Sequence, residues 1–183
     1  MSRRIMVVLL TLWCLALTGC SSGDIAGTPR EIDPTIDICP VCRMSVIDEH
    51  FAAQIIVSQG QAEIFDDIGC MSIFMRRLEA GAKDSILATY VKDFESMEWL
   101  KAQEAFYVQG RIDTPMSFGI VAFAAEEAAR KFAEEVGGKQ LTWEQVLTEP
   151  LTIGLDIEFN EEDFNVQDLD TGETRETQEE RGN

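Results

Sequence analysis

Two cysteines and a methionine lie within the six residues of the segment 39–44, Cys-Pro-Val-Cys-Arg-Met. Thiolate and thioether sulfur atoms select soft metal ions, Cu(I) above all, over Mg²⁺, Ca²⁺ or Mn²⁺. Cys42 and Met44 are two residues apart, so in an extended segment their side chains point to the same side. Cys39 can join them through a turn. Because Cu(I) accepts two or three soft ligands, this short motif alone supplies most of a copper site.

Further ligand candidates follow along the chain, and each one taken alone has a structural explanation. His50 is close to the motif and is a borderline ligand, although a single histidine usually lies on the surface. Cys70 follows two aspartates near an expected helix start, where a thiol pKa is lowered, but it also suits a small buried site. Met71 fits the apolar stripe of that helix. Pro115 fixes a turn that presents Met116.

Two other classes of site use the same cysteines. A structural zinc site needs four ligands, and Cys39, Cys42, Cys70 and His50 would supply a Cys₃His set. A thiol–disulfide protein would use the Cys39/Cys42 pair, but the redox motif opens a helix after a strand. The segment before Cys39 has no strand pattern. An inert Cys39–Cys42 disulfide is the remaining alternative.

The N-terminus has the pattern of a lipoprotein signal. Residues 1–19 combine two early arginines with an apolar run too short to span a membrane comfortably. The run ends in Leu-Thr-Gly-Cys, which resembles the bacterial lipobox, so we expect cleavage before Cys20 and lipidation of its thiol. Residues 20–36 then form a flexible tether. This predicts a membrane-anchored protein of the cell envelope that faces the periplasm, and Ser21 favours the outer membrane over the inner.

The charge of the chain excludes one class of partner. The net charge is −18 and no basic stripe is present, so the chain is not expected to bind nucleic acid. Metal carriage needs no enzymatic step, so we predict no enzyme activity and no small-molecule substrate. From residue 156 the chain has eleven acidic residues and two arginines. Residues 156–183 are therefore predicted to form a disordered acidic tail.

The apolar patterns between residues 37 and 155 predict one α+β domain built from two small ββαβ halves, about 37–100 and 101–155, with helices packed on short mixed sheets. In the first half we expect strands at 51–57, 62–65 and 86–91, and a helix that begins after Asp66 or Asp67 and ends at Gly81. In the second half we expect strands at 105–108, 119–123 and Leu141, a helix at 125–136 stopped by Gly137-Gly138, and a short helix at 143–147 capped by Thr142.

Several of these segments together resemble the NosL family, the accessory lipoproteins of nitrous oxide reductase. The resemblance rests on Cys-Pro-Val-Cys-Arg-Met at 39–44, His-Phe-Ala-Ala-Gln-Ile at 50–55 and Phe-Asp-Asp-Ile-Gly-Cys-Met at 65–71, and it continues through 105–108, 114–116 and 121–123. The family often has glycine at the position of Arg43.

The resemblance implies a fold of two ββαβ halves and a function as a Cu(I)-binding metallochaperone. Its expected partner is nitrous oxide reductase or the membrane-bound machinery that assembles it. The expected ligands are Cys42 and Met44. The further candidates that would complete the site are Cys39, His50, Met71 and Met116.

Overall fold

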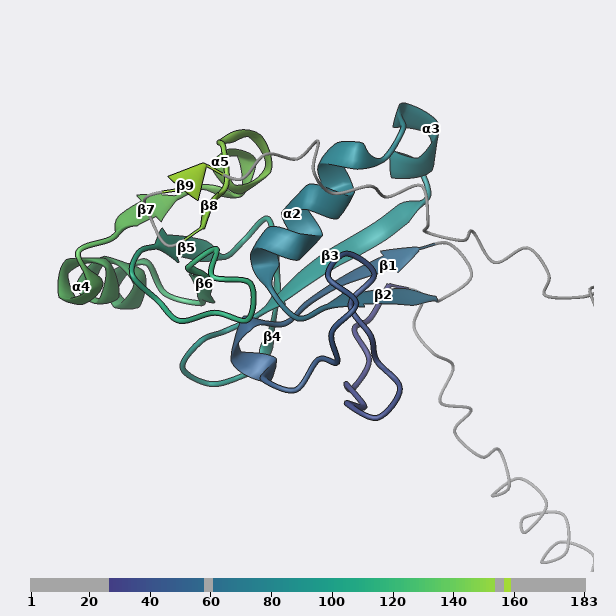
Figure 1. Ribbon diagram of the computed structural model, residues 1–183, viewed down its shortest axis with the longest axis horizontal. Coiled ribbons are helices and arrows are strands. Elements are labelled where there is room, and N and C mark those ends of the chain that lie inside the picture. The colour runs from purple at the N-terminus through teal and green to yellow at the C-terminus, as the bar shows by residue number, and fades with distance from the viewer. Residues whose placement is uncertain (1–26, 58–60, 154–156, 159–183) are drawn as a thin grey trace, which may run out of the picture.

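The computed structural model describes residues 27–57, 61–153 and 157–158 (Figure 1). The predicted signal peptide, the predicted lipidation site at Cys20 and most of the predicted acidic tail lie outside these residues. Within them, no helix combines the length and the apolar character needed to cross a membrane.

The first half is a four-stranded antiparallel sheet with the order β2-β1-β3-β4. It is built from a 3₁₀ turn, four strands and two helices: η2 (Glu49–Phe51), β1 (Ala53–Val57), β2 (Ala62–Phe65), α2 (Ile68–Arg77), α3 (Ala80–Lys83), β3 (Ile86–Lys92) and β4 (Trp99–Lys101). Strand β1 is the apolar run Ala-Gln-Ile-Ile-Val, and its first four side chains are buried. Strand β4 and helix α3 were not expected from the sequence.

The second half repeats this order on a three-stranded antiparallel sheet, β6-β5-β7. Its elements are β5 (Phe106–Gln109), β6 (Ile120–Phe123), α4 (Glu126–Val136), β7 (Lys139–Leu141) and α5 (Trp143–Thr148). In each half the first strand lies between the second and the third, and the helix connects those two. The predicted α+β class with two ββαβ halves is confirmed, but the expected mixed sheets were wrong, because every strand pair in both sheets is antiparallel. A short ladder of β8 (Thr152–Ile153) and β9 (Ile157–Glu158) continues the fold beyond residue 155.

Most helix ends follow the capping signals. Asp67 caps α2 by accepting a hydrogen bond from the Gly69 backbone amide, and Gly137 ends α4 with a left-handed φ of 62°. The capping box of Thr142 begins α5. The expected helix stop at Gly81 was wrong, because extended backbone at Leu78 ends α2 earlier and Gly81 lies inside α3.

Helix α2 lies where the two halves meet, in contact with β1 and β2 on one side and with α5 and β6 on the other (Figure 1). Its first six residues are therefore all buried. The Ser72 hydroxyl donates to the Val146 carbonyl of α5 over 2.6 Å. The halves are also joined where the Asp93 carboxylate accepts from the Ala124 amide over 2.8 Å. One apolar core extends through both halves and surrounds the start of α2.

Candidate metal centre

The Cys-Pro-Val-Cys-Arg-Met segment forms the tip of a short hairpin, residues 36–47, which we call the cysteine hairpin. Its arms pair antiparallel at Ile38 and Ser45. The Cys39 amide donates to the Met44 carbonyl over 2.9 Å, and the Cys39 carbonyl accepts from the Arg43 amide over 3.0 Å. These bonds close a tight turn that brings Cys39 and Cys42 together, as the sequence predicted.

Arg43 makes the hairpin tip differ from the expected geometry. Its φ is 65°, in the left-handed region that favours glycine. The segment from Cys42 to Met44 is therefore not extended, and the expectation that extended backbone aligns these two side chains was wrong. Met44 is 40 % exposed, whereas Cys42 is half-buried.

A second segment, from the end of β2 into α2, meets the cysteine hairpin from inside the molecule. Asp66 directly follows β2, Asp67 caps α2, and Cys70 lies in the first turn of the helix. A Cβ atom at Gly69 would collide with the buried ring of Phe118. Glycine at this position therefore allows the start of α2 to pack closely on the second half and fixes the place of Cys70.

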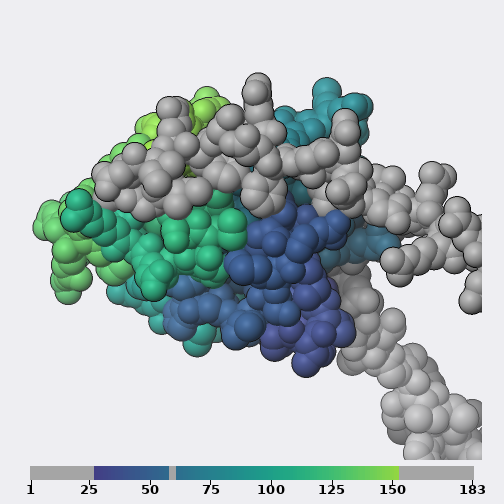
Figure 2. Space-filling model, in the orientation of Figure 1, coloured from purple at the N-terminus to yellow at the C-terminus, as the bar shows by residue number. Residues whose placement is uncertain are grey.

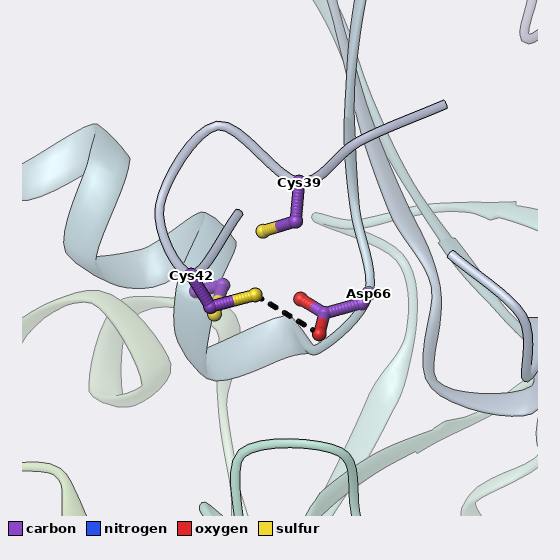
Figure 3. Close-up of side chains that lie close together, drawn as sticks. Cys39, Cys42 and Asp66 are labelled. Atoms are coloured by element: carbon purple, nitrogen blue, oxygen red, sulfur yellow. Dashed lines mark hydrogen bonds between the residues drawn. The ribbon is translucent and has the colours of Figure 1, made fainter. Parts of the chain in front are cut away.

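Together the two segments bring four donor groups into one cluster, Cys39, Cys42, Asp66 and Cys70, whose ligand atoms all lie within 4.8 Å of one another. The Cys42 thiol donates to Asp66 Oδ2 over 3.1 Å (Figure 3). Ligand atoms around a tetrahedral metal ion with bonds of about 2.3 Å are about 3.8 Å apart, so a small contraction of the cluster is enough to bind an ion.

The cluster opens to solvent on one side only. Cys39 and Cys70 are fully buried, and Asp66 is 2 % exposed. Cys42 is the one half-buried member of the four. An ion that enters or leaves therefore passes Cys42, next to which Met44 is exposed on the same hairpin tip.

The three thiols share their protons unequally. Hydrogen bonds from Cys42 and Cys70 lower the pKa of Cys39 well below its ordinary value, in spite of burial. The same contacts with Cys39 raise the pKa values of Cys42 and Cys70 in turn. The single proton of Cys42 is directed either at Cys39 or at Asp66 Oδ2. Cys39 is thus the preferred thiolate of the cluster, and a metal ion would displace the protons of the other two thiols.

Asp66 contributes to the cluster a carboxylate oxygen that no hydrogen bond within the described part of the chain occupies. Its Oδ1 atom is buried and has no hydrogen-bond partner among the described residues. Burial, followed by repulsion from the Cys39 thiolate, raises its pKa to about 7. A buried oxygen without a partner has an energetic cost. A metal ion at the cluster would remove this cost by taking that oxygen as a ligand.

The carboxylate of Asp67, in contrast, is occupied by hydrogen bonds to other parts of the fold. Its carboxylate accepts hydrogen bonds from the Gly69 amide over 2.7 Å, the Thr114 hydroxyl over 2.6 Å and the Met116 amide over 3.1 Å. Burial nevertheless raises its pKa to about 6. Through these bonds Asp67 holds the loop of Met116 against the start of α2, beside the cluster.

The other predicted ligands differ in where they lie. His50 is outside the cluster of donors: its Nδ1 lies 2.8 Å from Asp48 Oδ1, and its ring packs edge-on against Phe94. Met71 is fully buried in the apolar core, as its helical spacing also suggested. Met116 is partly buried against the same core. Cys20 lies outside the described residues.

Of the two donors from the Phe-Asp-Asp-Ile-Gly-Cys segment, Asp66 was not predicted as a ligand. Cys70 was predicted only as part of the zinc set or as a small buried residue. The Cys₃His zinc set is not assembled, because Asp66 and not His50 accompanies the thiols. Cys39 and Cys42 are free thiols in a turn and do not open a helix, which disfavours the thioredoxin-like alternative.

Comparison with known proteins gives a consistent picture. The NosL family model matches residues 29–151. The crystal structure of the copper chaperone NosL from Shewanella denitrificans is similar with a TM-score of 0.56 and 19 % sequence identity, over 66 % of this chain and 96 % of that one. At this identity the likeness shows a shared fold. None of the curated proteins matches the chain.

Proposed function

The chain belongs to the NosL family, and on this basis we propose that it is a copper chaperone that binds Cu(I) at the cysteine hairpin and passes it to a partner protein. The observation that carries the proposal is the cluster itself: three free thiols in one small volume, with Met44 exposed two residues after the half-buried Cys42 on the same hairpin tip. Sulfur-rich sets of this kind prefer Cu(I) to hard cations.

Cys42 has the central role in this proposal. From the inner side it is joined by Cys39 and Cys70, which are fully buried, and from the outer side by Met44, which is exposed. A ligand shared by an inner and an outer set lets the ion move outward without losing all its bonds. An acceptor can then replace the ligands one at a time, starting at the exposed edge.

The proposed destination is nitrous oxide reductase, for the maturation of its copper centres, either directly or through membrane-bound assembly machinery. The sequence resemblance in the segments 39–44, 50–55 and 65–71 supports this destination. The lipobox-like sequence before Cys20 supports attachment to an envelope membrane through lipid, on the periplasmic side. In this role the protein carries copper and catalyses no reaction.

A single substitution tests the copper assignment. We expect Cys42→Ala to abolish tight Cu(I) binding while the fold remains intact, because Cys42 is half-buried at the edge of the cluster and outside the main helices and strands. The assay is anaerobic competition with a chromophoric Cu(I) chelator. Ser45→Ala, in the same hairpin, is the matched control, since it leaves every sulfur ligand in place. An unchanged affinity in Cys42→Ala refutes the assignment.

Zinc is the second candidate, because a Cys₃Asp set with one spare carboxylate oxygen also suits a tetrahedral Zn²⁺ ion. A structural zinc site would make the fold depend on the metal. A copper chaperone with an apolar core through both halves remains folded when it is stripped. Circular dichroism before and after treatment with a zinc chelator separates the two: loss of helical signal supports zinc.

A further inference from the structure

The outer face of the cysteine hairpin carries a group of exposed apolar side chains that the metal cluster does not use. Burial alternates along the two arms: Asp37 and Val46 are buried, with their backbones joined by a hydrogen bond of 3.0 Å. On either side of them Ile36, Ile38 and Ile47 are 69 %, 46 % and 78 % exposed. The hairpin thus presents a surface of isoleucines whose inner side is anchored to the fold.

This concentration is unusual for the molecule. Seven large apolar side chains are exposed in the part of the chain that the structure describes. Four of them lie in the cysteine hairpin, namely the three isoleucines and Met44. Single exposed apolar residues need no explanation, but four on one short hairpin favour a surface for contact with another molecule. Residues 27–57, which include the cysteine hairpin, form a continuous purple-to-blue area on the face seen in Figure 2.

The charges around these side chains indicate what kind of molecule covers them. Residues 27–50 contain five acidic side chains and two arginines. Asp33 and Asp48, which flank the isoleucines in sequence, are both exposed. An anionic lipid surface and a second copy of this acidic chain would both be repelled. A protein surface that is apolar at its centre and basic at its rim is the complement.

We propose that the isoleucine surface of the cysteine hairpin is the docking site of the copper-accepting protein, whose own contact surface is apolar with a rim of lysine or arginine. The inference rests on the proposed function and adds the place and chemistry of the contact. Docking on Ile36, Ile38 and Ile47 brings the acceptor to the same hairpin whose tip holds Cys42 and Met44. The metal edge and the contact surface are then continuous, so exchange of ligands takes place inside the complex.

The test measures transfer separately from binding. The full chain is loaded with Cu(I) and mixed with metal-free nitrous oxide reductase and with envelope membranes that contain its assembly machinery. The second-order rate of copper transfer is then followed at several salt concentrations. Ile47→Ser removes the most exposed isoleucine, and Leu87→Ser, which changes a 51 % exposed leucine of β3, is the matched control. We expect the Ile47→Ser rate to fall about tenfold, as for a central interface residue, and the rate of the wild-type chain to fall with salt.

In both variants the affinity for Cu(I), measured against a chelator, stays at the wild-type value. Equal transfer rates for the wild-type chain and Ile47→Ser overturn the docking proposal alone. No transfer by the wild-type chain overturns the delivery role and the docking proposal with it. The two alternative occupants of the isoleucine surface are a second copy of the chain and an anionic membrane. They are tested by sedimentation and by flotation with phosphatidylglycerol vesicles, respectively. The proposal is also overturned if Ile47→Ser abolishes self-association or vesicle binding but leaves the rate of copper transfer unchanged.

Discussion

Removal of the Cys70 thiol tests whether the buried side of the cluster holds copper. Cys70 is fully buried in the first turn of α2, and its sulfur atom lies within 4.8 Å of the other three donors. Cys70→Ala removes one heavy atom from the core and leaves a small void. We expect the free energy of unfolding to fall by only about 1 kcal/mol. The protein therefore remains folded, and its metal affinity can be measured.

The expected effect on copper is much larger than the effect on stability. Loss of a group that merely supports a ligand costs about 10- to 100-fold in metal affinity. Loss of a direct ligand should exceed this, so we predict that Cys70→Ala binds Cu(I) at least about 100-fold more weakly than the wild-type chain. The affinity is measured by anaerobic competition with a chromophoric Cu(I) chelator, and a thermal melt of the same sample confirms the fold.

The matched control is Ser72→Ala, two residues further along the same helix. It removes a buried hydroxyl that donates to the Val146 carbonyl, and so costs about 1 kcal/mol of stability without touching the cluster. We expect its copper affinity to be that of the wild-type chain. If Cys70→Ala binds copper as tightly as the wild-type chain, or if Ser72→Ala loses as much affinity, the assignment of the inner thiols is refuted.

Two further predictions concern the fold that positions the site. Gly69→Ala should lower the free energy of unfolding in urea by about 1–3 kcal/mol, because its Cβ would collide with Phe118; wild-type stability would show that the contact is loose. Burial raises the pKa of Asp67 to about 6, so as the pH rises from 4 to above 6 this group alone should lower the stability of the metal-free protein by up to about 3 kcal/mol. The raised pKa of Asp66 adds to the fall over the same range. The folded chain there retains a proton that the unfolded chain has already released, and Asp67→Asn should weaken this dependence. A metal-free protein whose stability rises across that range would contradict the buried state of Asp67.

The fold could be predicted from the sequence to a large extent because local signals and the tertiary structure agree. The apolar periods gave both ββαβ halves, and the caps at Asp67, Gly137 and Thr142 marked helix ends within a residue or two. Strand β4 and helix α3 were missed, since three- and four-residue elements have no measurable period. The helix end predicted at Gly81 was wrong because a glycine ends a helix in this way when it adopts the left-handed conformation, and Gly81 does not.

The site was predicted only as far as it is local. The turn from Cys39 to Cys42 follows from their spacing, but the contact of Cys42 with Asp66 joins residues 24 positions apart. Asp66 could have been found, and Cys70 assigned to the copper site, by assuming that the second segment rich in ligand residues faces the first. His50 shows the opposite error, because closeness along the chain did not place it at the cluster.

Arg43 shows how a residue can depart from the family pattern and still fit the fold. Glycine is common at this position in the family, and the left-handed φ of 65° gives the physical reason. An arginine in this conformation costs roughly 1–2 kcal/mol relative to the ordinary right-handed region. The hydrogen bonds of the hairpin tip hold the backbone in place in spite of this cost.

The central claim, that this chain carries monovalent copper on sulfur, is tested most directly by X-ray absorption at the copper edge of the reduced, copper-loaded protein. We predict an edge typical of Cu(I) and a first coordination shell dominated by sulfur, which loses sulfur in Cys42→Ala. A shell of nitrogen and oxygen only, or a spectrum that is identical in Cys42→Ala, would contradict the account.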